Sequence, residues 1–173
     1  MKNKGYSFIE MMIVLAIMAV LTASAFLTIG IINNAKRDSG ITTFESQLDS
    51  LLVKTKAMSK KEANLCMVME KSDNQWCFYF GTIDETGNYV AKTDSSGNPE
   101  KAATLPANLD ISYAGTNTHA IASASRIVVM YRKADGTVLY GSGDYVFSFR
   151  DKEVARVTLD ADTGNHYRKE ASK

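Results

Sequence analysis

The sequence is poor in the residues that carry enzyme and metal chemistry. Its 173 residues include two histidines, His119 and His166, and two cysteines. The histidines lie far apart in the chain, without the spacing of a metal site, and the sequence has no glycine-rich phosphate loop or nucleophile arrangement. We therefore expect no enzyme activity, no metal and no cofactor, and we interpret both histidines as solvated side chains.

Charge of either sign is missing from one long stretch. The 22 residues from Met11 to Ile32 contain none, and about 20 apolar residues in a helix cross a hydrocarbon core of roughly 30 Å. The stretch is longer than the roughly 7–15 apolar residues of a secretory signal. Two simpler interpretations stay open: a signal cleaved at the "TASA" of Thr22–Ala25, and a plain, uncleaved membrane anchor.

A single carboxylate, Glu10, stands directly before this apolar run. Lys2 and Lys4 precede it, as expected for an end that stays in the cytoplasm. Two basic residues at positions 36–37 follow the run, so the charge bias alone does not fix the orientation. A carboxylate at the edge of a membrane needs a partner, and such residues are usually functional. Glu10 is therefore a candidate functional residue.

The stretch "KGYSFIEMMIVLAIMAVL" resembles the class III leader and N-terminal helix of type IV pilins and type II secretion pseudopilins. In that family a short basic leader ends in glycine, and an aromatic, a small polar, two apolar residues and a glutamate follow. Residues Gly5 to Glu10 fill these positions one for one. The sequence departs from the pattern twice: the first mature residue is more often phenylalanine than tyrosine, and the family's frequent helix proline has no counterpart at Leu27.

The resemblance implies cleavage between Gly5 and Tyr6 by a prepilin peptidase and methylation of the new amino group of Tyr6. In the family's fibres the glutamate pairs with that amine of a neighbouring subunit, which gives Glu10 a role in assembly. Removing one partner of an ion pair from an apolar environment costs about 3–5 kcal/mol. The expected partners are other pilin or pseudopilin subunits, the peptidase, the membrane and an inner-membrane assembly platform.

Beyond the apolar run the sequence predicts an α+β fold. Apolar residues from Ile41 to Met58 recur at steps of three and four, the spacing of one helical face. We expect the helix to continue to about residue 60, to bend at Gly30 or Gly40, and to pack on the chain's own antiparallel sheet and not on a coiled-coil partner. The expected domains are a leader at 1–5, a transmembrane and fibre-core helix at 6–32, and a head outside the cytoplasm at 33–173.

Short apolar segments after the helix predict β-strands. "ANLCMVMEK" and "WCFYFGTI" form a hairpin across "SDNQ", and "RIVVMYRKADGTVLYG" forms a second one, with a tight two-residue turn at Asp135–Gly136. "YVFSF", "VARVTL" and a short segment around Tyr167 complete the sheet, and "TDSSGNPE" is a loop. A soluble part of about 140 residues is large enough to bury its own core.

The order of the elements in the C-terminal half points to one branch of this family. "LLVKTKAMSKKEA" leads into a strand, and the chain closes with "FRDKEVARVTLDADTGNHYR". This order is similar to that of H-type pseudopilins and related minor pilins at fibre tips, which end in two strands and a Thr-Gly turn, here Thr163–Gly164. It implies a minor subunit of a type IV pilus or a type II secretion pseudopilus. The alternatives are a DNA-uptake tip subunit of a competence system and an unassembled single-span protein whose head binds a ligand.

Two groups of residues in the head are candidates for further chemistry. Cys66 and Cys77 form an even pair outside the cytoplasm, where two cysteines can form a disulfide. A turn centred on Asp73–Asn74 would instead place Cys77 opposite Glu70, so free buried cysteines are the alternative. The segment from Asp160 to Gly164 is similar to a calcium loop but lacks the bidentate glutamate, and a plain hairpin turn explains it.

The C-terminal segment carries a small excess of positive charge. From Arg126 to Lys173 there are nine basic and seven acidic residues. Some minor pilins bind DNA through basic C-terminal residues, which makes Arg168 and Lys169 candidates for DNA contact. Non-specific DNA binding needs several phosphate contacts, and an excess of two is small, so we interpret the segment as a solvated tail.

Overall fold

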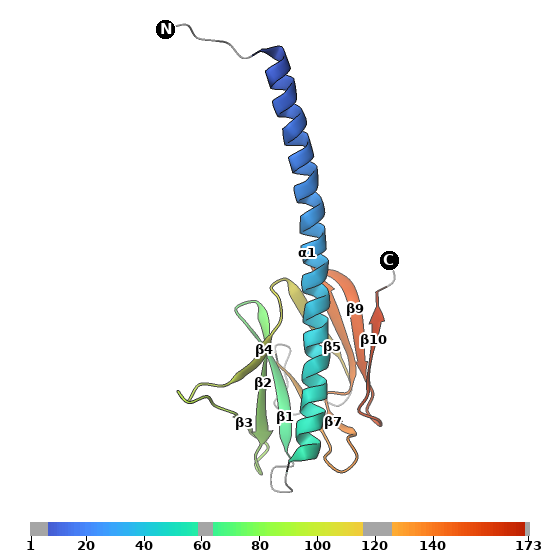
Figure 1. The fold of residues 1–173 in the computed structure, drawn as a ribbon. Helices are drawn as coiled ribbons and strands as arrows, with labels where there is room; N and C mark the ends of the chain where they lie inside the picture. The colour runs from blue at the N-terminus through green and yellow to red at the C-terminus, as the bar shows by residue number, and fades with distance from the viewer. Residues whose placement is uncertain (1–6, 59–63, 116–125, 172–173) are drawn as a thin grey trace. The chain divides into compact units, whose positions relative to one another are not determined.

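A computed structural model describes residues 7–58, 64–115 and 126–171. One long N-terminal helix, α1, is followed by antiparallel strands, so the predicted α+β class is confirmed (Figure 1). The chain divides into two compact units, Met1–Lys36 and Arg37–Lys173. The second unit, the head, contains the strands β1 Leu65–Ser72, β2 Gln75–Ile83, β3 Tyr89–Ala91, β4 Lys101–Thr104, β5 Leu109–Ala114, β6 Arg126–Tyr131, β7 Val138–Tyr140, β8 Gly143–Phe149, β9 Lys152–Leu159 and β10 His166–Glu170.

Helix α1 runs without interruption from Phe8 to Ala57. It ends slightly before the predicted limit near residue 60, and residues 59–63 lie outside the described part of the chain. The helix continues through both glycines at which we expected a bend. At Gly40 the missing side chain serves close packing, because a Cβ there would lie 2.4 Å from Cδ2 of Leu109 and 2.9 Å from Cδ of Pro106.

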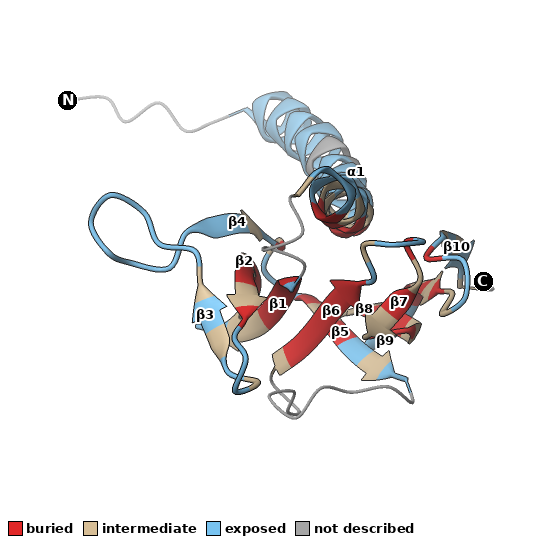
Figure 2. Cartoon of the chain, turned by 90° about the horizontal axis from the view of Figure 1, so that it is seen from below, coloured by how far each residue is buried: buried red, intermediate tan, exposed pale blue. Residues whose placement is uncertain are grey.

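The second half of α1 buries the apolar face that the sequence predicts. Ile41, Phe44, Leu48 and Leu51 are each at most 1% exposed. They share one core with apolar side chains of both sheets (Figure 2). The ring of Phe44 connects the layers, with its centroid 6.2 Å from that of Phe78 and 4.9 Å from that of Tyr145. Aromatic pairs at such distances contribute about 0.5–1.5 kcal/mol beyond the area they bury.

The strands form two sheets where the sequence predicted one. The first has the order β3-β2-β1-β6-β7, with β4 also paired to β2, and the second has the order β10-β9-β8-β5. The chain leaves the first sheet after β7 through Gly141 and Gly143, whose φ angles are +85° and +131°. Residues with side chains rarely adopt such angles, so this glycine pair lets the chain turn away and begin the second sheet.

The two predicted hairpins have different outcomes. β1 and β2 pair across Asp73 and Asn74, whose φ angles are 50° and 61°, so that hairpin is confirmed. The two-residue turn predicted at Asp135–Gly136 is wrong. β6 and β7 are joined by a longer loop in which the Gly136 N–H donates to the carbonyl of Arg132. The Asp135 carboxylate accepts hydrogen bonds from the N–H and hydroxyl of Thr137. These bonds stabilise the longer loop in place of a two-residue turn.

Two glycine turns join the sheets at one end of the head. The N–H of Val138, in the first sheet, donates to the carbonyl of Ala161, which follows β9 of the second sheet, at 2.9 Å. Next to this bond Gly164 has a φ of +68°, and a Cβ on it would lie 2.1 Å from the carbonyl oxygen of Gly136. Backbone atoms therefore occupy the space that a side chain at Gly164 would need.

We expect Gly164→Ala to lower the free energy of unfolding of the head by roughly 2–4 kcal/mol, from the positive φ and the backbone clash together. Gly87→Ala is the matched control, because Gly87 has a φ of +83° but nothing within 4 Å of an added Cβ; it should cost only about 1–2 kcal/mol. Thermal unfolding of the full chain in detergent, followed by near-UV circular dichroism, measures both. Equal midpoints for the two variants would contradict the packing described here.

Candidate assembly and anchoring site

The first part of α1 presents an apolar surface that no other described part of the chain covers. An 18-residue window of the helix has a mean hydropathy of 2.5, with none of it buried, and is long and apolar enough to cross a membrane by length and composition. From Phe8 to Ile32 the large apolar side chains that the structure describes are 46–79% exposed. Covering one such side chain contributes about 1.5–3 kcal/mol, so covering this surface with lipid or other protein would be strongly favourable.

The glutamate half of a capping box begins the helix. The carboxylate of Glu10 accepts a hydrogen bond from the backbone N–H of Ser7 at 3.1 Å, and the carbonyl of Ser7 accepts the first helical bond, from the N–H of Met11, at 3.2 Å. A glutamate at the third helical position that reaches back to the cap residue satisfies a donor that the helix leaves free. The sequence signal was "SFIE", a Ser-x-x-Glu motif, which the sequence analysis missed.

Gly5 and Tyr6, the predicted processing residues, lie outside the described residues. Glu10 lies inside them, is exposed, and occupies the first turn of α1. Its negative charge there is favourable, because the first turn carries the positive end of the helix dipole. Farther along, the hydroxyl of Thr22 donates to the carbonyl of Met18 at 2.6 Å. This polar side chain is thus satisfied within the helix, as an apolar environment requires.

The two cysteines are buried and unbonded. Cys77 pairs with Glu70 and Cys66 with Gly81, so the register predicted from the Asp73–Asn74 turn is confirmed. Cys66 and Glu70 are four residues apart on β1, or roughly 13 Å at about 3.3 Å per residue. A disulfide needs Cα atoms within about 7 Å, so the ladder separates the thiols too far for a disulfide, and the alternative of free buried cysteines holds. Burial raises the pKa of the Cys66 thiol to about 12, which keeps it protonated and unreactive.

The two candidate DNA contacts, Arg168 and Lys169, have different surroundings. The Arg168 guanidinium lies 3.1 Å from the carboxylate of Asp38 on α1 and 2.6 Å from that of Glu170, and its side chain is 24% exposed. Lys169 is exposed. Neighbouring residues of a strand point to opposite faces, so Arg168 faces the helix and Lys169 faces away from it. Two carboxylates already compensate the charge of Arg168.

The histidines and the aspartate-rich turn have separate surroundings. His119 lies outside the described residues, and Nδ1 of His166 is 3.9 Å from a carboxylate oxygen of Asp49 on α1, with the His166 side chain 21% exposed. Asp160 accepts hydrogen bonds from the N–H and hydroxyl of Thr163. These bonds hold the pKa of Asp160 below its usual value. The carboxylate thus closes its own turn, and the described residues hold no cluster of three metal-ligating side chains.

Comparison with known proteins identifies the N-terminal segment. Residues 1–26 match the family model described as the prokaryotic N-terminal methylation motif. This match indicates a class III leader of the pilin and pseudopilin kind, and the long helix that follows fits it. Searches among curated proteins and among solved structures gave no match.

Proposed function

We propose that this chain, which carries the N-terminal methylation motif of pilin-like proteins, is a minor structural subunit of a type IV pilus or a type II secretion pseudopilus. Residues 1–5 are a leader that a prepilin peptidase removes after Gly5, and Tyr6 becomes N-methylated. Residues 6–32 hold the chain in the inner membrane as a single span and then enter the fibre core. Residues 33–173 lie outside the cytoplasm and include the head. The role is structural, without enzyme activity.

The observation that carries this proposal is the apolar helical surface that begins directly after Glu10. A span that only anchors a protein needs no carboxylate at its edge, where the charge costs free energy. In the subunit before assembly, the Ser7 N–H partly satisfies the carboxylate. In a fibre, the methylated amine of a neighbour's Tyr6 supplies an opposite charge to the same group. Glu10 then selects the axial position of the incoming subunit.

The assignment to a minor, H-type subunit rests on the C-terminal elements. β8 and β9 form a hairpin through Arg150 and Asp151, and the Thr163–Gly164 turn leads into the short last strand β10. This is the order on which the resemblance to H-type pseudopilins depends. The order of these elements supports a tip or minor position in the fibre. Pili and pseudopili share this order, so it does not distinguish between them.

The test is recovery of the chain in fibres. The full chain is expressed with a prepilin peptidase in cells that carry a pilus or a type II secretion machine, and membranes and sheared fibres are compared by immunoblot. We expect a shortened chain in both fractions, with a small share in the fibres. A processed or unprocessed chain that is found in membranes alone, in both kinds of cell, would favour the unassembled single-span protein.

We expect no DNA binding above background. Of the two candidate residues, Arg168 is engaged in ion pairs and Lys169 is exposed. One exposed cation is too few, because non-specific binding needs several phosphate contacts. The measurement is fluorescence anisotropy of labelled duplex with the detergent-solubilised chain, over a range of salt. A micromolar complex that weakens steeply with salt, and that is lost in the Arg168→Ala, Lys169→Ala double variant, would instead make DNA uptake the function.

A further inference from the structure

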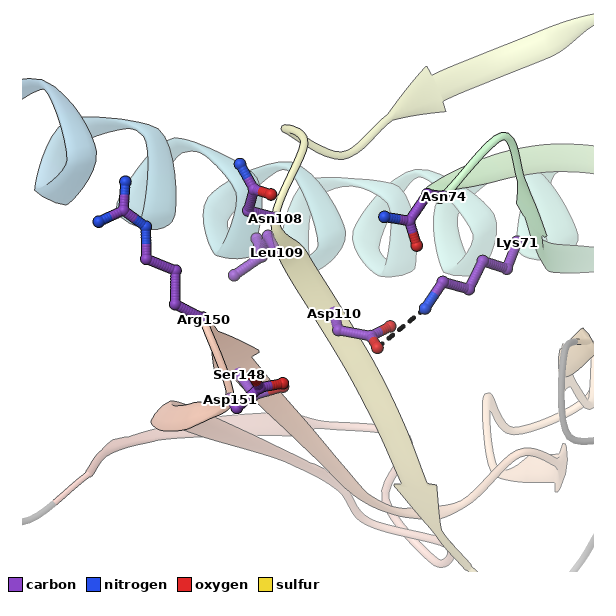
Figure 3. Close-up of a pocket in the computed structure, with 8 residues that line it drawn as sticks. All are labelled: Lys71, Asn74, Asn108, Leu109, Asp110, Ser148, Arg150 and Asp151. Carbon is purple, nitrogen blue, oxygen red and sulfur yellow. Dashed lines mark hydrogen bonds and ion pairs between the residues drawn. The ribbon is translucent and has the colours of Figure 1, made fainter.

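A polar pocket of about 360 Å³ opens where three turns of the head meet, but its charged side chains point in different directions. The β1–β2 turn, the start of β5 and the β8–β9 turn form its walls. Nζ of Lys71 lies 2.9 Å from a carboxylate oxygen of Asp110, and the Arg150 side chain extends away from both (Figure 3). The pocket therefore does not gather its charges around one ligand. The open edge of the second sheet is the stronger candidate for a binding surface.

Strand β10 (His166–Glu170) is an edge strand of the second sheet. It pairs with β9 alone and forms the outer margin of the sheet (Figure 1). One hydrogen bond beyond each end of β10 fixes the phase of this ladder. The N–H of Asp160 donates to the carbonyl of Asn165 at 2.9 Å, and the N–H of Ala171 donates to the carbonyl of Val154 at 3.2 Å. Because the bonding groups of an antiparallel pair alternate along each strand, the odd-numbered residues of β10 bond to β9.

The even-numbered residues of β10 present their backbone to the open edge. The N–H and C=O groups of His166, Arg168 and Glu170 point away from β9, and no backbone partner for them lies in the described part of the chain. Many edge strands are protected by a proline or a bulge. β10 contains no proline, and its pairing with β9 runs without a register shift. The edge can therefore accept an extended strand of a partner, a common mode of recognition.

The face of β10 that points away from α1 carries Tyr167 and Lys169. Tyr167 is 58% exposed, and it is the one exposed aromatic side chain of the head within the described residues. Aromatic residues are enriched at protein interfaces. Lysine on an edge strand opposes unspecific pairing, so a partner strand must place a group opposite Lys169 that suits its charge.

The face toward α1 is already compensated. The Arg168 guanidinium pairs with the carboxylates of Asp38 and Glu170, and Nδ1 of His166 lies 3.9 Å from a carboxylate oxygen of Asp49. The Glu170 side chain is still 60% exposed. A partner strand therefore meets an imidazole at one end of this face and an accessible carboxylate at the other.

The sequence of β10 is complementary to itself in the antiparallel direction. When two copies are centred on Arg168, each outward residue exchanges both of its backbone hydrogen bonds with the second copy. His166 then lies opposite the second copy's Glu170, and Tyr167 lies opposite the second copy's Lys169. An imidazole opposite a carboxylate and a phenol ring opposite an ammonium are both favourable cross-strand pairs. The two Arg168 side chains meet at the centre, where each already has its own carboxylates.

The neighbouring registers fit less well. A shift that keeps outward groups opposite each other moves the centre to Tyr167 or to Lys169, and it leaves one outward residue of each copy without a partner strand. The first shift places His166 opposite Arg168, and the second places Lys169 opposite Lys169. Basic side chains directly opposite each other are destabilising. The charges of β10 therefore favour the register centred on Arg168.

We propose that β10 pairs with β10 of a second copy of this chain, antiparallel and centred on Arg168. The second sheets of the two heads then join into one continuous sheet about a two-fold axis. Such a contact has five residues a side, against roughly 20–30 in a standard interface, so the dimer is weak and reversible. A two-fold contact closes on itself and does not extend into a fibre. The dimer is thus a state of the unassembled chain, and the inference depends on the head alone.

Cysteine cross-linking tests this register. Tyr167→Cys and Lys169→Cys are introduced into two differently tagged full-length chains, which are expressed together in cells that lack a pilus and a type II secretion machine. In the proposed register these positions of opposite copies form a pair with Cα atoms about 4.5 Å apart, within the range of a disulfide. Membranes are treated with a mild oxidant and analysed on non-reducing gels. Lys101→Cys, at an exposed position of β4, controls for random collisions.

We expect a linked dimer of the two different chains when Tyr167→Cys and Lys169→Cys are combined. Either variant alone should link no more than Lys101→Cys does. Arg168→Cys lies on the two-fold axis and should link with itself. The wild type supplies the background, because both native cysteines are buried.

A proline variant tests the backbone hydrogen bonds at the edge. Glu170→Pro removes an N–H that points outward and leaves the ladder with β9 intact, as proline on an edge strand can. Glu170→Ala is the matched control, because it loses the same carboxylate and keeps the N–H. In analytical ultracentrifugation of the full chain in detergent, we expect Glu170→Pro to dimerise about tenfold more weakly than Glu170→Ala.

Several results would overturn the proposal. Linking of the combined variants at the level of Lys101→Cys would show that β10 does not pair with itself. Linking of Tyr167→Cys or Lys169→Cys with itself, in place of the combination, would establish a different register. A linked product with a different protein would assign the edge to a strand of that protein. Equal dimerisation of the two Glu170 variants would place the contact elsewhere, for example on the apolar part of α1.

Discussion

Glu10→Ala leaves the chain in the membrane and cleaved, but lowers its recovery in sheared fibres. Insertion is unchanged or slightly easier, because the substitution removes a carboxylate at the edge of the apolar run. Cleavage survives because Gly5 and the basic leader are intact, while methylation of Tyr6 falls. Assembly fails or weakens because the neighbour's amine becomes an unpaired charge in an apolar core, at a cost of about 3–5 kcal/mol, or roughly two to four orders of magnitude in affinity. A subunit at the fibre tip would show a partial defect.

Glu10 also caps the helix, so a second variant is needed to separate this role from pairing between subunits. Glu10→Ala also removes the hydrogen bond to the Ser7 N–H, a loss of at most about 1 kcal/mol. Glu10→Gln retains an oxygen that can accept that bond and removes only the charge. We expect both variants to be inserted and cleaved, and both to be depleted from fibres by immunoblot. If Glu10→Gln enters fibres at wild-type levels, the carboxylate serves the helix cap, and pairing between subunits is not its role.

Gly5→Val should abolish processing of the leader. The peptidase must accommodate the residue before the cleaved bond in a narrow site, and valine adds a branched side chain where glycine has none. Co-expression with a prepilin peptidase should shorten the wild-type chain and leave the variant at full length, as resolved by gel electrophoresis. Uncleaved chains stay in the membrane and are absent from fibres.

Ala25→Val is the control for this experiment. A signal cleaved after Ala25 needs a small residue there, whereas a class III leader does not use that position. We expect Ala25→Val to be processed as the wild type is. Efficient cleavage of Gly5→Val, or a block in Ala25→Val, would contradict the assignment of Gly5 to processing.

The features that could be predicted from the sequence are those set by short-range patterns. The apolar spacing from Ile41 to Met58 placed the buried face of α1 correctly, because a helix repeats its faces over three to four residues. The polar segment around Asp73–Asn74 located the first hairpin and its register. In both cases the residues that carry the signal lie in the element that they predict.

The features that the sequence analysis missed depend on contacts between distant segments. Gly40 was interpreted only as a point where the helix can bend, and its close approach to Pro106 and Leu109, far along the chain, could not be predicted. Arg168 appeared to be a free cation, but Asp38 on α1 compensates it. The pocket around Asp110 combines three turns that share no sequence pattern. The capping box is the exception, since Ser7 and Glu10 are neighbours and the motif could have been read directly.

The most direct test of the pilin-like assignment is mass spectrometry of the mature N-terminus. The full-length chain is produced in cells with a prepilin peptidase, purified from membranes, and analysed intact and after proteolysis. The account predicts a chain that begins at Tyr6, has lost residues Met1 to Gly5, and carries one added methyl group on its amino terminus. A chain that still begins at Met1, or one that begins after Ala25, would contradict it.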